Sequence, residues 1–104
     1  VLYYTSNSAG NFTVNIRGNS GTTLASLLST GQAATVAFLV TNGATGYYNT
    51  TVQVDGTTTG VTTKWQGGTA PTSGSANSID VYTYTVIKTG SGTYTVLASQ
   101  TRFA

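Results

Sequence analysis

The segment 81–88, Val-Tyr-Thr-Tyr-Thr-Val-Ile-Lys, decides the fold class of this 104-residue chain. Its residues Tyr82, Tyr84 and Val86 alternate with threonines, and a period of two is the pattern of a β-strand with one buried face. The segment 93–103 follows with a similar but less clear alternation. We therefore predict two adjacent strands here, with their tyrosines packed in a ladder across them.

The same alternation recurs in the preceding part of the chain. We predict further strands at 2–6, 11–17, 33–41, 47–55 and 61–65. The segment 33–41 is more continuously apolar, which predicts a central strand covered on both faces. The dipeptide Asp55-Gly56 predicts a turn, because both residues tolerate a positive φ.

Two segments depart from this period. Residues 23–31 space their leucines at i, i+3 and i+4, which predicts one or two helical turns that close an end of the core. Thr22 or Thr23 suits the N-cap of these turns, and Gly31 suits the C-cap. Residues 67–78 are small and polar, and they predict an exposed loop.

About seven short strands, joined by turn signals and accompanied by one helical turn, indicate an all-β protein. The length of 104 residues fits one domain. We predict a single domain over residues 1–104, folded as an antiparallel, jelly-roll-like β-sandwich of about seven to eight strands. A small barrel is the alternative.

The composition argues against catalysis. Charged residues make up 6% of the chain, against about 25% in an average soluble domain. The chain has no His and no Cys, so the Ser-His, Cys-His and common zinc arrangements are absent. The only two carboxylates are Asp55, in the predicted turn, and Asp80, at the entry to a predicted strand. These positions favour turn and strand-end roles over an acid–base pair.

We therefore predict a protein that is not an enzyme and has no catalytic residues. A calcium site that combines Asp55 and Asp80 is the alternative use of the carboxylates. Two carboxylates without an Asp-x-Asp cluster are a weak calcium signal, so we predict neither a metal nor a cofactor.

Charge and hydropathy also bear on the partners. The four cationic residues are spread along the sequence and cannot neutralise a row of phosphates, so we expect no nucleic-acid partner. The longest apolar run, 33–40, is far shorter than the roughly 20 residues of a membrane span, so we expect no membrane partner. A surface of Thr, Ser, Asn and Gly has little charge to keep copies apart, which suits an ordered assembly.

Three aromatic residues are candidate binding residues. Tyr47 and Tyr48 are adjacent, so in a strand at most one of them enters the core. Trp65 precedes a Gly-Gly pair. An exposed platform of Tyr47, Tyr48 and Trp65 would stack on a sugar ring. The alternative, which we favour, is that Trp65 and one tyrosine cap the hydrophobic core.

The most specific stretch is 64–71, Lys-Trp-Gln-Gly-Gly-Thr-Ala-Pro. Together with 77–89 and 94–104 it resembles the C-terminal end of virion structural, fibre-like proteins of marine tailed phages, including cyanophages. Residues 24–31, 33–43 and the Tyr47-Tyr48 region are also similar to that family. In such proteins the domain usually ends a longer chain.

The resemblance implies a non-catalytic part of the virion exterior, on the capsid or the tail. Such a capsid-decoration or tail- or head-fibre module would assemble with copies of itself, as a trimer or another homo-oligomer, and with other virion proteins. The alternative is an adhesive module at a fibre tip, which binds a glycan or another receptor on the host surface.

Overall fold

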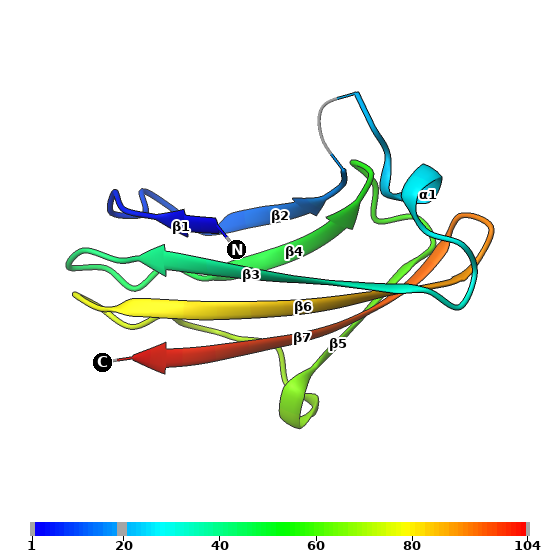
Figure 1. The fold of residues 1–104 in the computed structure, drawn as a ribbon. Helices are drawn as coiled ribbons and strands as arrows, with labels where there is room; N and C mark the ends of the chain where they lie inside the picture. Colours follow the sequence, from blue (N-terminus) through cyan, green and yellow to red (C-terminus); the bar gives the residue numbers. More distant parts are fainter. Residues whose placement is uncertain (1, 19–20, 104) are drawn as a thin grey trace.

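Seven strands in two sheets make up the part of the chain described by this computed structural model, residues 2–18 and 21–103 (Figure 1). The larger sheet has the strand order β1-β3-β6-β7-β5, and the smaller sheet pairs β2 with β4. The strands are β1 (Leu2–Tyr4), β2 (Phe12–Ile16), β3 (Ala33–Thr41), β4 (Asn49–Val54), β5 (Val61–Trp65), β6 (Ile79–Gly90) and β7 (Thr93–Phe103). A short helix, α1 (Leu24–Leu27), and a 3-10 turn, η1 (Gln66–Gly68), complete the elements. The chain is mostly β, which confirms the predicted all-β class in its coarser form.

The direction of the strands differs from the prediction. β1 runs parallel to β3, β2 to β4 and β5 to β7, whereas β3–β6 and β6–β7 are antiparallel. A jelly roll is built from antiparallel strands, so the antiparallel, jelly-roll-like arrangement is wrong for these sheets. The alternation of side chains has a period of two in both kinds of sheet. It therefore indicates the buried face of a strand but not the direction of its neighbour.

The core lies between β2–β4 and one face of the larger sheet, which we call the inner face. The inner face carries the even-numbered residues of β3, β6 and β7. Tyr82, Tyr84 and Val86 are fully buried there, which confirms the face predicted for this segment. Across the core, Phe12 of β2 packs edge to face against Phe38 and Tyr82, with ring centroids 5.8 and 5.6 Å apart.

Buried polar groups join the two sheets at Asn49, the first residue of β4. The Tyr84 hydroxyl donates to Asn49 Oδ1 over 3.1 Å, and the Asn49 backbone N–H donates to the Tyr82 hydroxyl over 3.3 Å. The Asn49 side-chain amide donates to the carbonyls of Phe12 and Thr51, both at 2.9 Å. One buried amide therefore binds both strands of the smaller sheet and β6 of the larger sheet.

Two predictions about packing are corrected. β3 is covered only on its inner face, because no described layer lies over the other face of the larger sheet, and Val40 is its one buried residue. The predicted tyrosine ladder does not cross to β7, since Tyr94 lies opposite Lys88 in the register. Instead, Tyr82 and Tyr84 stack along β6 itself, with ring centroids 6.3 Å apart and an interplanar angle of 6°.

One helical turn forms within the segment predicted to hold one or two. Thr23 is the N-cap, as predicted, and its hydroxyl accepts the backbone N–H of Ser26 over 3.2 Å. The predicted C-cap is wrong, because α1 already ends at Leu27 and Leu28 occupies the cap position. Gly31 instead takes a φ of +90° just before β3, and its N–H donates to the carbonyl of Lys88. Figure 1 shows α1 at the end of the molecule where β6 turns into β7.

We predict that alkaline pH destabilises the fold through its buried tyrosines. Burial raises the pKa of Tyr84 well above its ordinary value of 10.0 and also raises that of Tyr82. These hydroxyls stay protonated in the folded chain while they ionise in the unfolded chain above about pH 10, so the free energy of unfolding falls as pH rises past that value. The expected slope is about 1.4 kcal/mol per pH unit for each such tyrosine.

Urea unfolding of the wild type and of Tyr84→Phe between pH 7 and 11.5 checks this prediction. Tyr84→Phe should be less stable at pH 7 by about 1–3 kcal/mol, because Asn49 Oδ1 loses its donor. Its stability should also fall less steeply above pH 10. The matched control is Tyr3→Phe at a half-exposed position. An equal alkaline slope in the wild type and Tyr84→Phe would contradict the assignment.

Candidate functional site

The three aromatic candidates lie on different elements and are all half-buried. Trp65 ends β5, and its ring packs edge to face against Tyr84, with centroids 6.4 Å apart and an interplanar angle of 73°. Tyr47 and Tyr48 precede β4, where the N–H of Tyr48 donates to Asn11 Oδ1 over 3.1 Å. Within residues 2–18 and 21–103, no ring contact joins Trp65 to either tyrosine.

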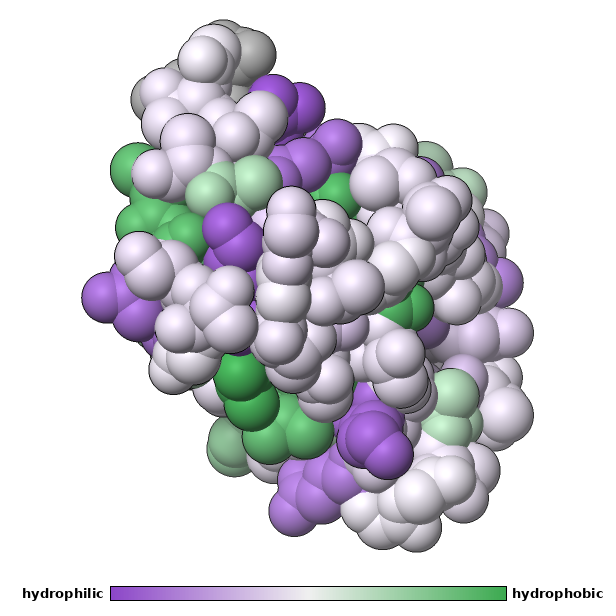
Figure 2. Space-filling view, turned by 90° about the vertical axis from the view of Figure 1, so that its right-hand side faces the viewer, coloured by the Kyte–Doolittle hydropathy of each residue, from purple (hydrophilic) through white to green (hydrophobic). Residues whose placement is uncertain are grey.

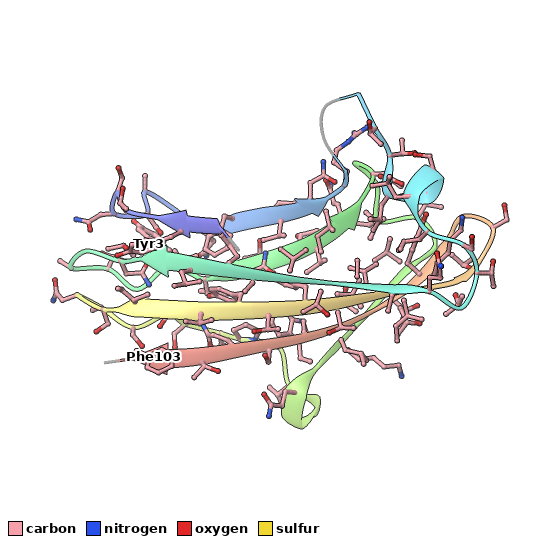
Figure 3. The ribbon with its side chains drawn as sticks, viewed as in Figure 1. Tyr3 and Phe103 are labelled. Carbon is pink, nitrogen blue, oxygen red and sulfur yellow. The ribbon has the colours of Figure 1, made fainter. Side chains whose placement is uncertain are left out.

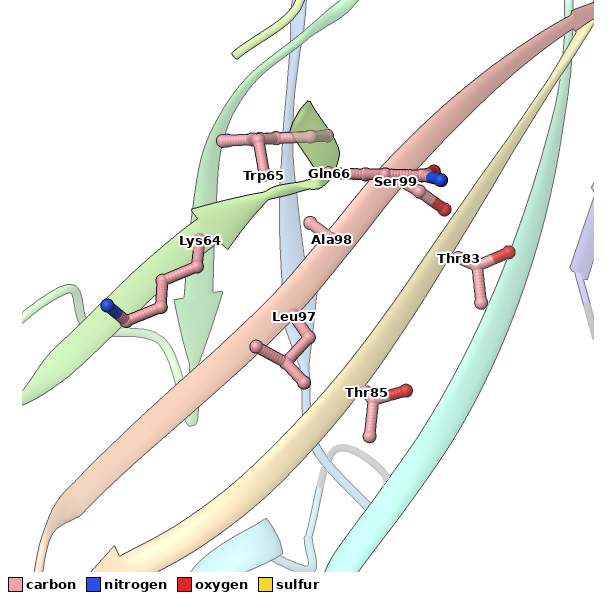
Figure 4. Close-up of a pocket in the computed structure, with 8 residues that line it drawn as sticks. All are labelled: Lys64, Trp65, Gln66, Thr83, Thr85, Leu97, Ala98 and Ser99. Atoms are coloured by element: carbon pink, nitrogen blue, oxygen red, sulfur yellow. The ribbon is translucent and has the colours of Figure 1, made fainter. Parts of the chain in front are cut away.

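A shallow hollow of about 330 Å³ lies beside Trp65 (Figure 4). Its lining comes from β5, η1, β6 and β7 and consists of Lys64, Trp65, Gln66, Thr83, Thr85, Leu97, Ala98 and Ser99. A second hollow of about 170 Å³ shares Trp65 and Gln66 and extends to Pro71 and Gln100. Hydroxyl, amide and amine groups line these hollows, together with the indole ring. Such groups can hydrogen-bond and stack on a polar ligand.

The most buried polar cluster of the described chain surrounds Asp80 of β6, which is fully buried. Asp80 Oδ2 accepts the backbone N–H of Ser75 at 2.9 Å and the side-chain amide of Asn42 at 3.1 Å. Arg102 lies opposite Asp80 in the register of β6 and β7. The Arg102 guanidinium donates from Nε to Ser75 Oγ over 2.6 Å and from Nη2 to the carbonyl of Gly74 over 3.0 Å. Through these hydrogen bonds the cluster binds the loop between β3 and β4 and the loop before β6 to the larger sheet.

Most of the loop 67–78 is exposed, as its composition predicts, but two of its residues depart from this prediction. Gly74 and Ser75, in its middle, are buried. A Cβ at Gly74 would collide with the carbonyl of Tyr47, so only glycine permits this approach of the two loops. The physical reason is Asp80, whose buried carboxylate needs backbone donors from this loop.

The second carboxylate serves the opposite end of the molecule. Asp55 Oδ1 accepts the N–H of Leu24 at 2.6 Å, and its Oδ2 accepts the N–H of Ala25 at 3.0 Å, so Asp55 caps the first turn of α1. The predicted Asp55-Gly56 turn is confirmed by φ values of 52° and 80°. Figure 1 places the end of β4, which precedes Asp55, and the start of β6, which contains Asp80, at opposite ends of the molecule.

The two carboxylates therefore share no site, whether for acid–base chemistry or for calcium. No group of three or more His, Cys, Asp or Glu side chains that could hold a metal ion occurs among the described residues. No helix in that same part of the chain is long and apolar enough to cross a membrane.

Comparison with known proteins found no matching family model, no matching curated protein and no matching solved structure.

We predict that Asp80→Ala destabilises the fold by about 2–4 kcal/mol, because two buried donors, the Ser75 N–H and the Asn42 amide, lose their acceptor. Asp80→Asn retains one acceptor oxygen and should cost less. Urea unfolding measures both, with Thr62→Ala at an exposed position of β5 as the control. Asp80→Ala with the stability of the control would show that the cluster contributes nothing.

Proposed function

We propose that this chain is a non-catalytic structural module of a phage virion, a capsid-decoration or tail- or head-fibre part that assembles on the particle exterior. In this proposal the fold acts as a two-layer β-sandwich whose smaller layer is the β2–β4 pair. The proposal is supported by the resemblance of residues 64–71, 77–89 and 94–104 to marine phage virion proteins.

The observation that carries the proposal is that both carboxylates and two of the four cationic side chains form hydrogen bonds within the chain itself. Both carboxylates are engaged, Asp55 with α1 and Asp80 with Ser75 and Asn42. Carboxylates that are committed to backbone and amide donors are poorly placed to transfer protons to a substrate.

Two of the four cations are committed in the same way. Lys88 Nζ donates to the carbonyls of Ala25 and Leu28, both at 3.0 Å, and so holds the C-terminal end of α1. Arg102 binds Ser75 and Gly74. Pale residues of intermediate hydropathy dominate the end of the molecule in Figure 2, and the strongly hydrophilic residues form small separate groups. A surface of this kind has little repulsion between copies, which favours assembly.

Detection of the protein in purified particles tests the leading proposal. Infected cultures of a marine phage host are separated into particles and free protein on a density gradient, and peptides of this chain are quantified in each fraction. We expect the peptides to sediment with intact particles and an antibody to label the outside of the particles. A chain found only in the free, soluble fraction would overturn the proposal.

A glycan-binding function is the second candidate, and the hollow beside Trp65 is the observation that favours it. Its hydroxyl, amide and indole groups suit a neutral sugar ring, for which no charged partner is needed. Tyr47 and Tyr48 would contribute only if an extended glycan reached the neighbouring loop. This role is compatible with a virion part at a fibre tip as long as the face of the larger sheet that carries Thr83, Leu97 and Ser99 is free, because these residues line the hollow.

For this second candidate we predict binding to at least one sugar on a glycan array. Binding should weaken at least tenfold in Gln66→Ala, since Gln66 is exposed and lines both hollows. It should also be lost in Trp65→Ala, and Thr50→Ala at an exposed position of the smaller sheet is the control. No hit at millimolar sugar, or equal binding by Gln66→Ala and the control, would remove this candidate.

A further inference from the structure

We propose that two copies of this chain pair face to face through the face of the larger sheet that points away from the core. This outer face carries Tyr3 of β1, the odd-numbered residues of β3, β6 and β7, and the even-numbered residues of β5. The inference deepens the proposed function and rests on it in one respect: a virion part needs a surface for contact with its own copies.

Exposed apolar side chains concentrate on the outer face. The described chain has four exposed large apolar residues, and three of them, Tyr3, Leu97 and Phe103, project from this face with 50%, 45% and 60% of their surface accessible. Tyr3 belongs to this face because it lies beside Leu39 in the β1–β3 register. Figure 3 shows Tyr3 and Phe103 at the same end of the sheet, although a hundred residues of sequence separate them.

The strand register places three more apolar residues of the outer face beside Tyr3 and Phe103. Leu39 lies opposite Val81, and Ile79 lies opposite Phe103. We call Tyr3, Leu39, Ile79, Val81 and Phe103 the apolar end of the outer face. The middle of the face is formed by small or hydroxyl-bearing side chains in one register row, Ala37, Thr83 and Ser99. A contiguous apolar patch with a hydroxyl-bearing neighbour is typical of a protein–protein interaction surface.

Charge does not oppose the contact. Among the outer-face residues only Lys64 is charged, and it lies on β5, at the margin of the sheet. Pairing of two outer faces therefore buries no carboxylate and sets no like charges against each other at the centre. The desolvation cost that normally penalises burial of a charged surface is small here.

The size of the outer face suits a stable dimer. In spatial order the five strands of the sheet contain 3, 9, 12, 11 and 5 residues. At about 3.3 Å per residue and about 4.8 Å between strands, the face offers roughly 600 Å² per copy, or roughly 1,200 Å² in a pair. Specific interfaces bury about 1,200–2,000 Å² in total.

The arrangement of side chains also suits a second copy in particular. Two sheets stack face to face about 10 Å apart, with their strands within about 30° of each other. A two-fold axis roughly along the strands sets the apolar end of one copy against the apolar end of the other. It also sets the hydroxyl-bearing middle against its own counterpart, as an isologous contact requires.

Sedimentation equilibrium of the isolated chain tests the pairing. We expect a dimer with twice the 10.7 kDa mass of the chain. Thr83→Glu places a charge at the centre of the contact and should weaken pairing at least 100-fold. The matched control is Thr13→Glu, which adds the same charge at an exposed strand position of the smaller sheet. Phe103→Ser, at a residue with 60% exposure, supplies a second variant that leaves the core intact.

A cross-linking experiment locates the contact independently. The chain has no cysteine, so Thr83→Cys introduces a single thiol in the middle of the outer face, and oxidation should yield a covalent dimer. Thr13→Cys should yield far less. A monomeric wild type at millimolar concentration, or equal behaviour of the Thr83 and Thr13 variants, would overturn the pairing. A monomer that still occurs in particles would overturn the pairing alone, whereas a dimer absent from particles would overturn only the virion role.

Discussion

The side chain of Asn49 holds the two sheets together, and the smaller sheet depends on it. A two-stranded sheet is at best marginally stable in water and needs another layer to pack against. Asn49 supplies the polar part of that attachment: its amide donates to the carbonyl of Phe12, and its Oδ1 accepts the hydroxyl of Tyr84. Because these groups are buried, each would cost free energy without its partner. These hydrogen bonds therefore determine where the β2–β4 pair lies on the larger sheet, and they also stabilise its packing there.

The two ends of the core are closed by charged groups that act on the backbone of loops. At one end Asp55 accepts two N–H groups of α1, while Lys88 donates to carbonyls at the other end of the same helix. At the opposite end Asp80 and Arg102 both bind Ser75. A four-residue helix has little stability of its own. Its position is therefore set by the carboxylate and the ammonium group, with Leu24 buried beneath it.

The strands were predictable from sequence because their side chains alternate. β3, β5 and β7 begin and end where the pattern predicts, and the buried face of β6 is the predicted one. Three parallel pairings were not predictable, since strand direction depends on contacts between distant segments. The positions of Asp55 in a turn and Asp80 at a strand entry were predicted as well.

The partners of these carboxylates were not predictable. Asp55 binds Leu24 across 31 positions, and Asp80 binds Asn42 across 38 positions. No local pattern encodes such pairs, and a small, polar loop gives no sign that Ser75 is buried. The three aromatic candidates illustrate the same limit: Trp65 finds its ring partner on β6, at Tyr84, which the local sequence around Trp65 does not indicate.

The alternation that builds the core also determines the character of the outer face. In β6 each inward tyrosine or valine is followed by an outward residue, and these outward residues are threonine or an aliphatic residue, without a charge. Threonine suits this position because its branched Cβ favours the strand while its hydroxyl meets solvent. Edge strands commonly carry lysine or another charge, which discourages pairing with the edge of another sheet. Here Lys64 provides one on the edge strand β5, whereas the central strands carry none on that face. Both carboxylates, Lys88 and Arg102 thus hold α1 and the loops in place. The central strands leave the middle of the broad face uncharged and open to contact.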